Sequence, residues 1–517
     1  MPELRTTWEK ITNVAIAGLA RQELPVIEGD DAIAQLCAGI MATGEKPAQL
    51  LSIAGALQLY QTVGARPPHD STPAPAPAAV ETKSYCSFQI MRLLEIALTN
   101  SDIYQILPEL ASLIQKNDMV VMPNMLPMIL TAMVKSPERL ETLLPIIGEH
   151  GIWLARQNPA WQKILLSVSE EFCREKWETG TRAERTAALK YLRGIDPASA
   201  RALLEEVMKA EAPETLNEFI GALTINLSLD DEPLLESLLD SKRKAVRKTV
   251  STILDCIPGT AYQQRMIERL NQFIKITPAQ PATLFPPRMK QDVKIEVITP
   301  AEFDKTWSRD AIEFDNNYPD LSYCVREMIT AVPLSYWEDR GQCGPAELIK
   351  CANSESLIRI ILRTWLTAVR KQKNVVWMEE IIRHGDYEEV YKFLQFIVAA
   401  FTYKERDEMF ISLLKDPPEQ SYQLLCALRG HNEVWSLELS VEVVNFNEKL
   451  TSKDEHLKTK EGNISNLMTN YIQPCYLGYV RSDFAKIRSN FSETICNMRV
   501  AILDFREEMY RAFEEKI

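Results

Sequence analysis

The chain has 517 residues and a formal net charge of −13, with 46% hydrophobic and 25% charged residues. The length suits roughly three to four ordinary domains or one long array of repeats, and the composition is that of a soluble globular protein. The acidic balance disfavours a general nucleic-acid-binding protein, because such proteins normally carry a basic surface.

The cysteines and the lack of targeting signals favour a cytoplasmic location. The ten cysteines have no regular spacing and no C-x-x-C pair, which disfavours a secreted disulfide scaffold. The first residues show no basic region followed by an apolar core, so no signal peptide is expected. No stretch approaches the ~20 apolar residues that span a bilayer, so no membrane segment is expected.

Residues 1–65 are predicted to form an N-terminal helical segment, and residues 66–84 a linker rich in Pro and Ala. Pro67, Pro68 and the alternating run at 73–77 favour an extended, disordered chain.

The N-terminal segment contains a near match to a phosphate-binding loop, Gly39-x4-Gly44-Glu-Lys46-Pro47. In the true motif, Lys directly follows the second Gly and precedes a Ser or Thr that binds magnesium. Here Glu45 separates Gly44 from Lys46, and Pro47 replaces the hydroxyl residue. We interpret the match as a chance loop and expect no cofactor.

Residues 85–277 are predicted to form tandem short helices, because helix start signals recur there at close spacing. Thr181-Arg-Ala-Glu184 is a capping box, and Pro follows a cap residue at Ser136, Asn158 and Asp196. Helices this short cannot bury an apolar face alone, so neighbours must stack, as in a HEAT-type α-solenoid. The apolar positions at helical spacing are Ile103, Ile106, Leu107, Leu110 and Ile114; Leu140, Leu143, Leu144 and Ile147, ending at Gly148; Ala200, Leu203, Leu204, Val207 and Met208; Leu234, Leu235, Leu238 and Leu239; and Val246, Val250, Ile253, Leu254 and Ile257.

Residues 278–320 are expected to be an irregular, proline-marked connection, with one short strand at 293–298 where apolar residues alternate. A second helical block is predicted over 321–446. Its clearest apolar face is formed by Ile358, Ile361, Leu362, Trp365, Leu366 and Val369.

Residues 435–443 alternate like a strand but also fit a helix capped by Ser436. We favour the helix, because a lone strand would leave its backbone groups unpaired. The final section, 447–517, is predicted to contain a polar loop at 451–465 and a long amphipathic helix over 482–516. The apolar seam of that helix can pack internally, on the second block or on the helices before Pro474, or it can dock a partner chain. We favour internal packing.

One basic run, Lys242, Arg243, Lys244 and Arg247, is a candidate contact for an anion or an acidic partner near a helix N-terminus. The alternative is a solvated helix face, which charge runs usually form, and we favour it. In HEAT repeats an Asp in the turn and an Arg in the second helix often stabilise the helical pair. Asp240 and Arg247 resemble that pair.

The remaining chemistry-bearing residues predict no catalytic, cofactor or metal site. The sequence contains no H-E-x-x-H or G-x-S-x-G motif, and its histidines have no metal-ligand spacing. His150-Gly151 and His384-Gly385 fit helix C-terminal ends, where His suits the dipole. Tryptophans such as Trp153, Trp161, Trp337 and Trp365 lie on or beside apolar faces and are predicted to pack in the core. The five histidines are His69, His150, His384, His431 and His456.

Six phrases together resemble an uncharacterised bacterial family of helical-repeat proteins, a domain of unknown function. They are Gln157-Asn-Pro-Ala-Trp161, Trp177-Glu-Thr-Gly-Thr-Arg-Ala-Glu-Arg185, Asp196-Pro-Ala-Ser-Ala-Arg201, Asp231-Glu-Pro-Leu-Leu-Glu-Ser-Leu-Leu-Asp240 with Val246-Arg247, Ala331-Val-Pro-Leu-Ser-Tyr-Trp337 and Asp504-Phe-Arg-Glu-Glu-Met509. The resemblance covers most of the chain and is weakest over 62–85 and 447–470. Members are typically encoded beside a MoxR-type AAA+ ATPase, a von Willebrand factor A-domain protein and a SWIM zinc-finger protein. The resemblance therefore implies a scaffold or adaptor for such a module and carries over no catalytic residues.

The sequence thus predicts an all-α fold, a HEAT-like α-solenoid of short helical pairs with a long C-terminal amphipathic helix. The favoured function is non-catalytic protein–protein interaction. The alternative is a HEAT-like, nucleic-acid-associated protein of DNA-repair type, which a basic concave face would favour. A hydrolase is a third hypothesis with no motif behind it.

Overall fold

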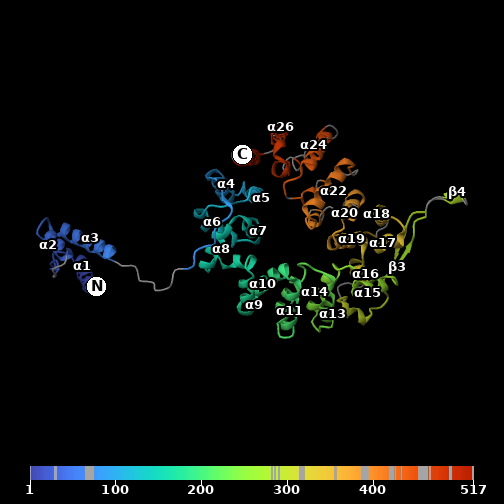
Figure 1. Ribbon diagram of the computed structural model, residues 1–517, viewed down its shortest axis with the longest axis horizontal. Helices are drawn as coiled ribbons and strands as arrows, with labels where there is room; N and C mark the ends of the chain where they lie inside the picture. Colours follow the sequence, from blue (N-terminus) through green and yellow to red (C-terminus); the bar gives the residue numbers. More distant parts are fainter. Residues whose placement is uncertain are drawn as a thin grey trace. The chain divides into compact units, whose positions relative to one another are not determined.

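The computed structural model is mostly helical and divides into two compact units, Met1–Ala76 and Pro77–Ile517 (Figure 1). The predicted all-α, repeat-like fold is confirmed. Much of the predicted linker and polar loop lies outside the described residues. These are 2–27, 32–64, 75–280, 283–284, 287–288, 291–313, 321–353, 358–385, 394, 396–417, 424, 427–431, 433–451, 464, 467–487 and 492–514.

The first unit is built, in its described part, from α1 (Pro2–Ala17), α2 (Ala32–Met41) and α3 (Lys46–Gly64). Helices α1 and α2 both contact α3. The side chains that form the core between them are Ile11, Ile33, Cys37, Ile53 and Leu57.

The second unit opens with a long run of short helices, interrupted by two-residue strands and 3-10 turns. In chain order these are β1 (Ser84–Tyr85), α4 (Phe88–Thr99), η1 (Tyr104–Ile106), α5 (Leu107–Lys116), β2 (Met119–Val120), η2 (Pro123–Met125), α6 (Leu126–Met133), α7 (Pro137–Leu143), η3 (Leu144–Ile146), α8 (Gly148–Gln157), η4 (Gln162–Ser167), α9 (Glu170–Thr179), α10 (Arg182–Ile195), α11 (Pro197–Val207), α12 (Pro213–Ala222), η5 (Leu229–Asp231), α13 (Glu232–Leu239), α14 (Lys244–Leu254) and α15 (Ala261–Leu270).

Helices α9 to α14 stack as the sequence predicts. Helix α10 contacts α9, α11 and α12, and α14 contacts both α12 and α13, so alternate helices form one row and the helices between them a second. The predicted capping box is present, with the Thr181 side chain accepting from the Glu184 N–H. The Asp196 carboxylate accepts from the Ala198 and Ser199 N–H groups, each at 3.1 Å. These caps satisfy donors that a helix start leaves unpaired.

Two local predictions are wrong. Asn158 does not start an α-helix, because its Oδ1 accepts from the Ala160 N–H at 3.0 Å in a tight turn that leads into the 3-10 helix η4. Gly148 does not end a helix but begins α8 with a φ of +62°, so His150 lies in the first turn of α8 rather than at a C-terminus. At Asn158 a side-chain turn forms in place of an α-helix start. At Gly148 a left-handed backbone conformation begins a new helix where the sequence predicted an end.

The connection between the blocks contains the predicted strand, β6 (Lys294–Val297). It pairs antiparallel with β3 (Ile274–Thr277), with Ile274 opposite Val297 and Thr277 opposite Lys294. The sequence predicts that the helical repeats extend to residue 277, and this prediction is wrong for residues 274–277. They form β3 instead, because the backbone groups of β6 need a partner strand. Beyond it are β4 (Thr283–Leu284), paired with β5 (Pro287–Arg288), and η6 (Lys305–Asp310).

Helices resume in the second block. Helix α18 contacts α20 and α20 contacts α22 in the same alternating way, whereas α16 contacts α19, three helices later in the chain. The ambiguous segment at 435–443 is helical from Leu437 onward, and the Ser436 Oγ accepts from the Leu439 N–H at 3.1 Å, as expected of the cap that the sequence predicts. The described elements are α16 (Ser322–Ala331), α17 (Leu334–Gly341), α18 (Pro345–Asn353), α19 (Ile358–Gln372), α20 (Val375–His384), α22 (Tyr403–Lys415), α24 (Leu437–Thr451), η8 (Pro474–Tyr476), α26 (Leu477–Ile487) and α27 (Glu493–Glu514).

The C-terminal helix is long and amphipathic, but it begins later than predicted. The predicted helix over 482–516 corresponds to the end of α26 and to a separate α27. Ser492 starts the new helix, since its backbone carbonyl accepts from the Cys496 N–H at 3.0 Å and its Oγ from the Ile495 N–H at 3.5 Å.

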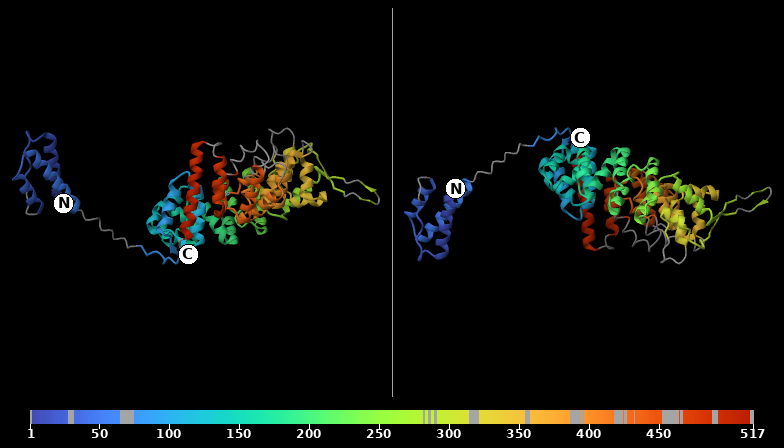
Figure 2. Two further views of the ribbon diagram at one scale, coloured as in Figure 1. Left: turned by 90° about the horizontal axis from the view of Figure 1, so that it is seen from above. Right: turned by 90° about the horizontal axis from the view of Figure 1, so that it is seen from below.

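Helix α27 closes the second unit on itself. Its apolar side chains Ile502, Phe505, Met509 and Phe513 are part of the same core as α4 and α5, while Leu503 belongs to the core of the later helices. Figure 2 shows α27 lying along the first helices of this unit. The apolar seam of α27 therefore packs internally, as predicted. It packs mainly on the helices of residues 85–277, which were not among the predicted packing surfaces.

The end of the predicted linker is attached to α8. The Glu81 Oε2 accepts from the Glu149 N–H at 2.8 Å, and Oε1 accepts from the N–H groups of Thr82 and Lys83. The helices in the described ranges include none with the length and apolarity to cross a membrane.

Candidate functional site

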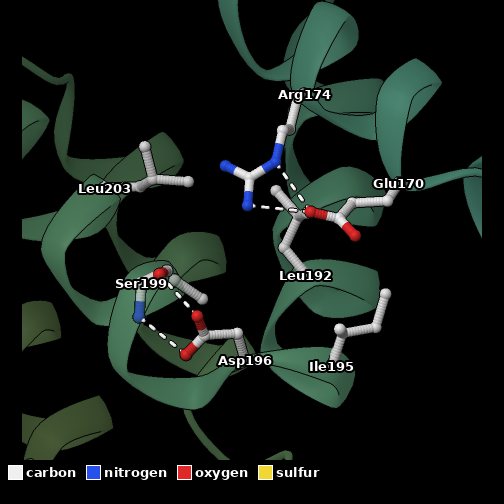
Figure 3. Close-up of a pocket in the computed structure, with 8 residues that line it drawn as sticks. Glu170, Arg174, Leu192, Ile195, Asp196, Ser199 and Leu203 are labelled. Carbon is white, nitrogen blue, oxygen red and sulfur yellow. Dashed lines mark hydrogen bonds and ion pairs between the residues drawn. The ribbon is translucent and has the colours of Figure 1, made fainter.

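A hollow between α9, α10 and α11 is too small for a ligand. It measures about 10 Å³, which is about the room that one water molecule needs. Figure 3 shows that its polar groups are already used within the fold. Glu170 pairs with Arg174 at 2.9 Å, and Asp196 caps the next helix through Ser199.

The basic run at the start of α14 is largely engaged inside the protein. Arg247 donates to the Ser241 carbonyl at 2.7 Å and pairs with Glu313, which also lies 3.6 Å from the Lys244 ammonium. Arg243 donates to the Glu211 carbonyl at 3.4 Å, whereas Lys242 is exposed. These contacts favour a structural role for the run.

The HEAT-like pair suggested for Asp240 and Arg247 is not the one that forms. Asp240 instead accepts from Arg309 at 2.8 Å, and Arg309 comes from η6 in the connection. The connection folds back over α13 and supplies Arg309 as the partner of Asp240, in place of the Arg247 that the sequence suggested.

The other candidates from the sequence also have structural surroundings. The loop resembling a phosphate-binding motif joins two helices, α2 and α3, and Lys46 lies 3.7 Å from Glu23. No group of three or more potential metal ligands occurs among the described residues. His384 ends α20 as predicted, where burial lowers its pKa.

Aromatic and histidine side chains pack in the core of the second block. Trp337, Trp365 and Trp377 are fully buried and stack edge to face, with successive ring centres 5.2 and 5.1 Å apart. This confirms the core packing predicted for Trp337 and Trp365. His431 is buried against Asp407, with Nε2 and Oδ1 2.7 Å apart, and thus connects elements of the same block.

The closure by α27 creates the most developed site in the described structure, and a buried ion pair fixes it. The Arg506 guanidinium makes two parallel contacts with Glu109 of α5, at 2.9 and 2.8 Å. Its remaining donors reach the carbonyls of Thr469 and Ile472 at 3.0 and 2.6 Å. Because both charges are fully paired, the pair fixes α27 on α5 without an uncompensated buried charge.

Beside this pair lies a cavity of about 710 Å³, within the size range of pockets that bind ligands. One wall is α5 with η1, and the opposite wall is formed by the start of α22, the segment before α24 and the segment before η8. The lining residues are Gln105, Pro108, Glu109, Ser112, Leu113, Lys116, Tyr403, Glu433, Val434, Asn470, Tyr471, Gln473 and Tyr510.

Asn470 lines this cavity and carries a hydrogen-bond acceptor without a partner in the described part of the chain. The side chain is only 5% exposed, and its Nδ2 donates to Gln105 Oε1 at 3.2 Å. Its buried Oδ1 has no hydrogen-bond partner among the described residues. A buried acceptor left unpaired costs roughly 1–3 kcal/mol, so this position is one where a hydrogen-bond donor would be stabilising.

The three tyrosines of the cavity are kept neutral. Burial raises the pKa of Tyr403 to about 12, and its hydroxyl donates to the Val434 carbonyl at 2.6 Å. Burial also raises the pKa of Tyr471 and of Tyr510, whose hydroxyl donates to Glu109. The walls therefore offer aromatic surface, one free acceptor and, at an exposed position, the ammonium group of Lys116. This combination suits binding.

The family model for DUF5691, described as a family of unknown function, matches residues 10–513. The chain belongs to this family. No curated protein and no solved structure matches the chain. This match and the resemblance noted from the sequence agree that the chain is an uncharacterised domain.

Sequence reasoning missed the cavity of this DUF5691 protein because its walls lie far apart along the chain. Asn470 and Gln105 are separated by 365 positions, and no local pattern joins them. Two signals were available. Glu109 interrupts the apolar face of α5, and Arg506 interrupts the apolar seam of α27. Charged side chains at such positions are rarely buried unless they are paired, so each residue signalled that it has a partner.

Proposed function

We propose that this protein is a non-catalytic scaffold whose closure cavity, between α5 and the segments before α24 and η8, binds an extended segment of a partner protein. The free Oδ1 of buried Asn470 carries the proposal, because it needs a donor and every peptide N–H is one. The fold supports it, since arrays of stacked helices typically present extended binding surfaces.

The chemistry of the cavity suggests what the bound segment contains. Tyr403, Tyr471 and Tyr510 suit an apolar or aromatic side chain, and Lys116 suits an acidic residue beside it. The volume of about 710 Å³ suits a short stretch of peptide rather than a folded surface.

The resemblance found in the sequence suggests the partner. We propose that a MoxR-type AAA+ ATPase or a von Willebrand factor A-domain protein supplies the segment, in the cytoplasm of a bacterium. Reduced thiols suit that compartment, and the ten cysteines show no spacing typical of a disulfide scaffold.

Calorimetry with each purified partner protein tests the proposal. Asn470→Leu removes the free acceptor at similar volume and should weaken binding about tenfold, the equivalent of one hydrogen bond. Lys116→Glu should weaken it further and reverse its salt dependence. Lys209→Glu, an exposed lysine just after α11, is the matched control and should bind like the wild type.

Two results would overturn the proposal. One is that neither partner protein binds the wild-type chain at concentrations up to about 100 μM, the weak end of specific association. The other is that a partner binds the Asn470→Leu and Lys116→Glu variants as tightly as it binds the wild type.

A further inference from the structure

A second cleft lies on α19 (Figure 1) and shares no described lining residue with the closure cavity. It measures about 250 Å³, which is below the usual range of pockets that enclose a whole small molecule. Its size suits one large side chain of a longer segment. The described lining residues are Arg363, Leu366, Thr367 and Arg370 of α19, together with Phe396 and Ile397.

The cleft combines a buried apolar surface with an exposed aromatic ring. Leu366 and Ile397 are only 3% and 6% exposed, whereas Phe396 is 64% exposed. A large apolar side chain placed against Phe396 would remove apolar surface of both partners from water. The cleft therefore favours an apolar or aromatic side chain as its occupant.

Two arginines lie on either side of Leu366 along α19. Arg363 and Arg370 are both exposed and seven residues apart, so they share one face of the helix, roughly 10 Å apart along its axis. Among the described residues, Arg370 forms no hydrogen bond or ion pair, whereas its neighbour Lys371 pairs with the buried Asp255. The Arg370 guanidinium is therefore available to an anionic ligand beside the apolar cleft.

The charge of α19 is opposite to that of the whole chain. The sequence of Ile358–Gln372 contains four basic residues and no acidic residue, although the chain has a net charge of −13. The overall charge repels an acidic segment, so a local basic face determines where such a segment binds.

We propose that this cleft binds an acidic segment of a partner protein, in which an apolar or aromatic side chain lies between two carboxylates. The apolar side chain enters the cleft beside Phe396, and the carboxylates pair with Arg363 and Arg370. An extended chain of three residues spans roughly 10 Å, so carboxylates on either side of one apolar residue match the spacing of the two arginines.

The arrangement favours a peptide over other anions. A small inorganic anion or a lone carboxylate reaches one arginine and leaves the apolar surface uncovered. A nucleic acid gains its affinity from many phosphate contacts with a basic surface, and the net charge of −13 opposes that mode of binding.

Calorimetry of the full chain with a synthetic peptide tests the site. The probe is an unlabelled peptide whose central Phe has a Glu and an Asp on each side, between Gly-Ser ends. We expect saturable binding with a dissociation constant between about 10 μM and 1 mM, because the contact is small. Added salt should weaken it. The same peptide with Lys in place of each acidic residue should not bind.

Variants of the cleft separate its charge from its apolar surface. Arg370→Glu should weaken peptide binding about tenfold, because repulsion replaces attraction. Phe396→Ser should also weaken it about tenfold, the usual effect of truncating an aromatic anchor. Arg370→Lys keeps the charge and should bind within about threefold of the wild type. Lys209→Glu, an exposed lysine just after α11, is the matched control and should bind like the wild type.

The changed side chains are exposed, so all variants should melt at the temperature of the wild type. A wild type that binds no peptide up to about 1 mM would overturn the proposal, and salt-sensitive binding of oligothymidylate lost in Arg370→Glu would then assign the cleft to nucleic acid. Unchanged affinity in both Arg370→Glu and Phe396→Ser would also overturn it. A loss in Lys116→Glu but not in Arg370→Glu would place the peptide in the closure cavity instead.

Discussion

A single glycine shows how one residue fixes the junction between the predicted linker and the helical array. Gly148 begins α8 at φ +62°, and a Cβ there would lie 2.1 Å from Glu81 Oε2 and 3.1 Å from Val120 Cγ1. Glu81 occupies that space because its carboxylate caps α8 through the Glu149 N–H. The left-handed turn and the cap of α8 therefore both depend on Gly148 having no side chain.

Gly148→Ala should accordingly lower the stability of the second unit by about 2 kcal/mol, the sum of a left-handed non-glycine residue and a lost cap. Urea unfolding followed by circular dichroism measures the change. Gly194→Ala is the matched control, because Gly194 lies within α10 and its added Cβ would meet nothing within 4 Å. That control should be neutral or stabilising by up to about 1 kcal/mol. Equal effects at the two glycines would contradict the role assigned to the turn.

Among the elements, α27 determines whether the second unit closes. It contributes apolar side chains to the core of the first helices and one leucine, Leu503, to the core of the later ones. The Arg506–Glu109 pair lies where these cores meet and also borders the cavity. Closure and the candidate binding site therefore depend on one ion pair.

Arg506→Met should destabilise the closed form by about 3–5 kcal/mol, because it leaves the Glu109 carboxylate buried without its cation. Hydrogen exchange should then rise in α4 and α5 as well as in α27, and urea unfolding gives the magnitude. The control is Arg481→Met, which removes a partly exposed arginine paired with Asp504 and Glu507 and should cost less than about 1 kcal/mol. Adding Glu109→Gln to Arg506→Met should recover part of the loss. Equal losses at Arg506 and Arg481 would be incompatible with a buried closure pair.

The elements also show what sequence can and cannot predict. Local signals succeeded where a helix is determined by its own residues, as with the Thr181 capping box and the Ser436 cap that resolved the helix of α24. They failed where a residue distant in sequence determines the contact. Asp240, for example, pairs with Arg309 rather than with Arg247. The cavity is the extreme case, since the Nδ2 of Asn470 donates to Gln105, which lies 365 positions away in the sequence.

At the scale of the whole molecule, the two units differ in how they achieve stability. The second unit contains two cores, to both of which α27 contributes side chains, whereas the first carries one small core and several exposed apolar side chains. The closure cavity belongs to the second unit alone, so the proposed binding of a partner segment does not depend on how the first unit is stabilised.

The boundary between the units should be the first site of proteolysis. Residues 75–80 have no regular structure, Val80 is 85% exposed, and a Pro/Ala-rich sequence has little large apolar surface to bury. Elastase, which cleaves after small residues, should cut first after Ala78 or Ala79, because the earlier alanines at 74 and 76 precede prolines. Glu81 is bound to α8, so trimming should stop there and leave a stable fragment that extends to the C-terminus. Mass spectrometry of the time course identifies the cuts. In the Gly148→Ala variant, where Glu81 is displaced, trimming should continue toward Ser84 before it stops. First cuts within 181–277 would instead show that the stacked repeats, rather than the junction, are the least stable part of the chain.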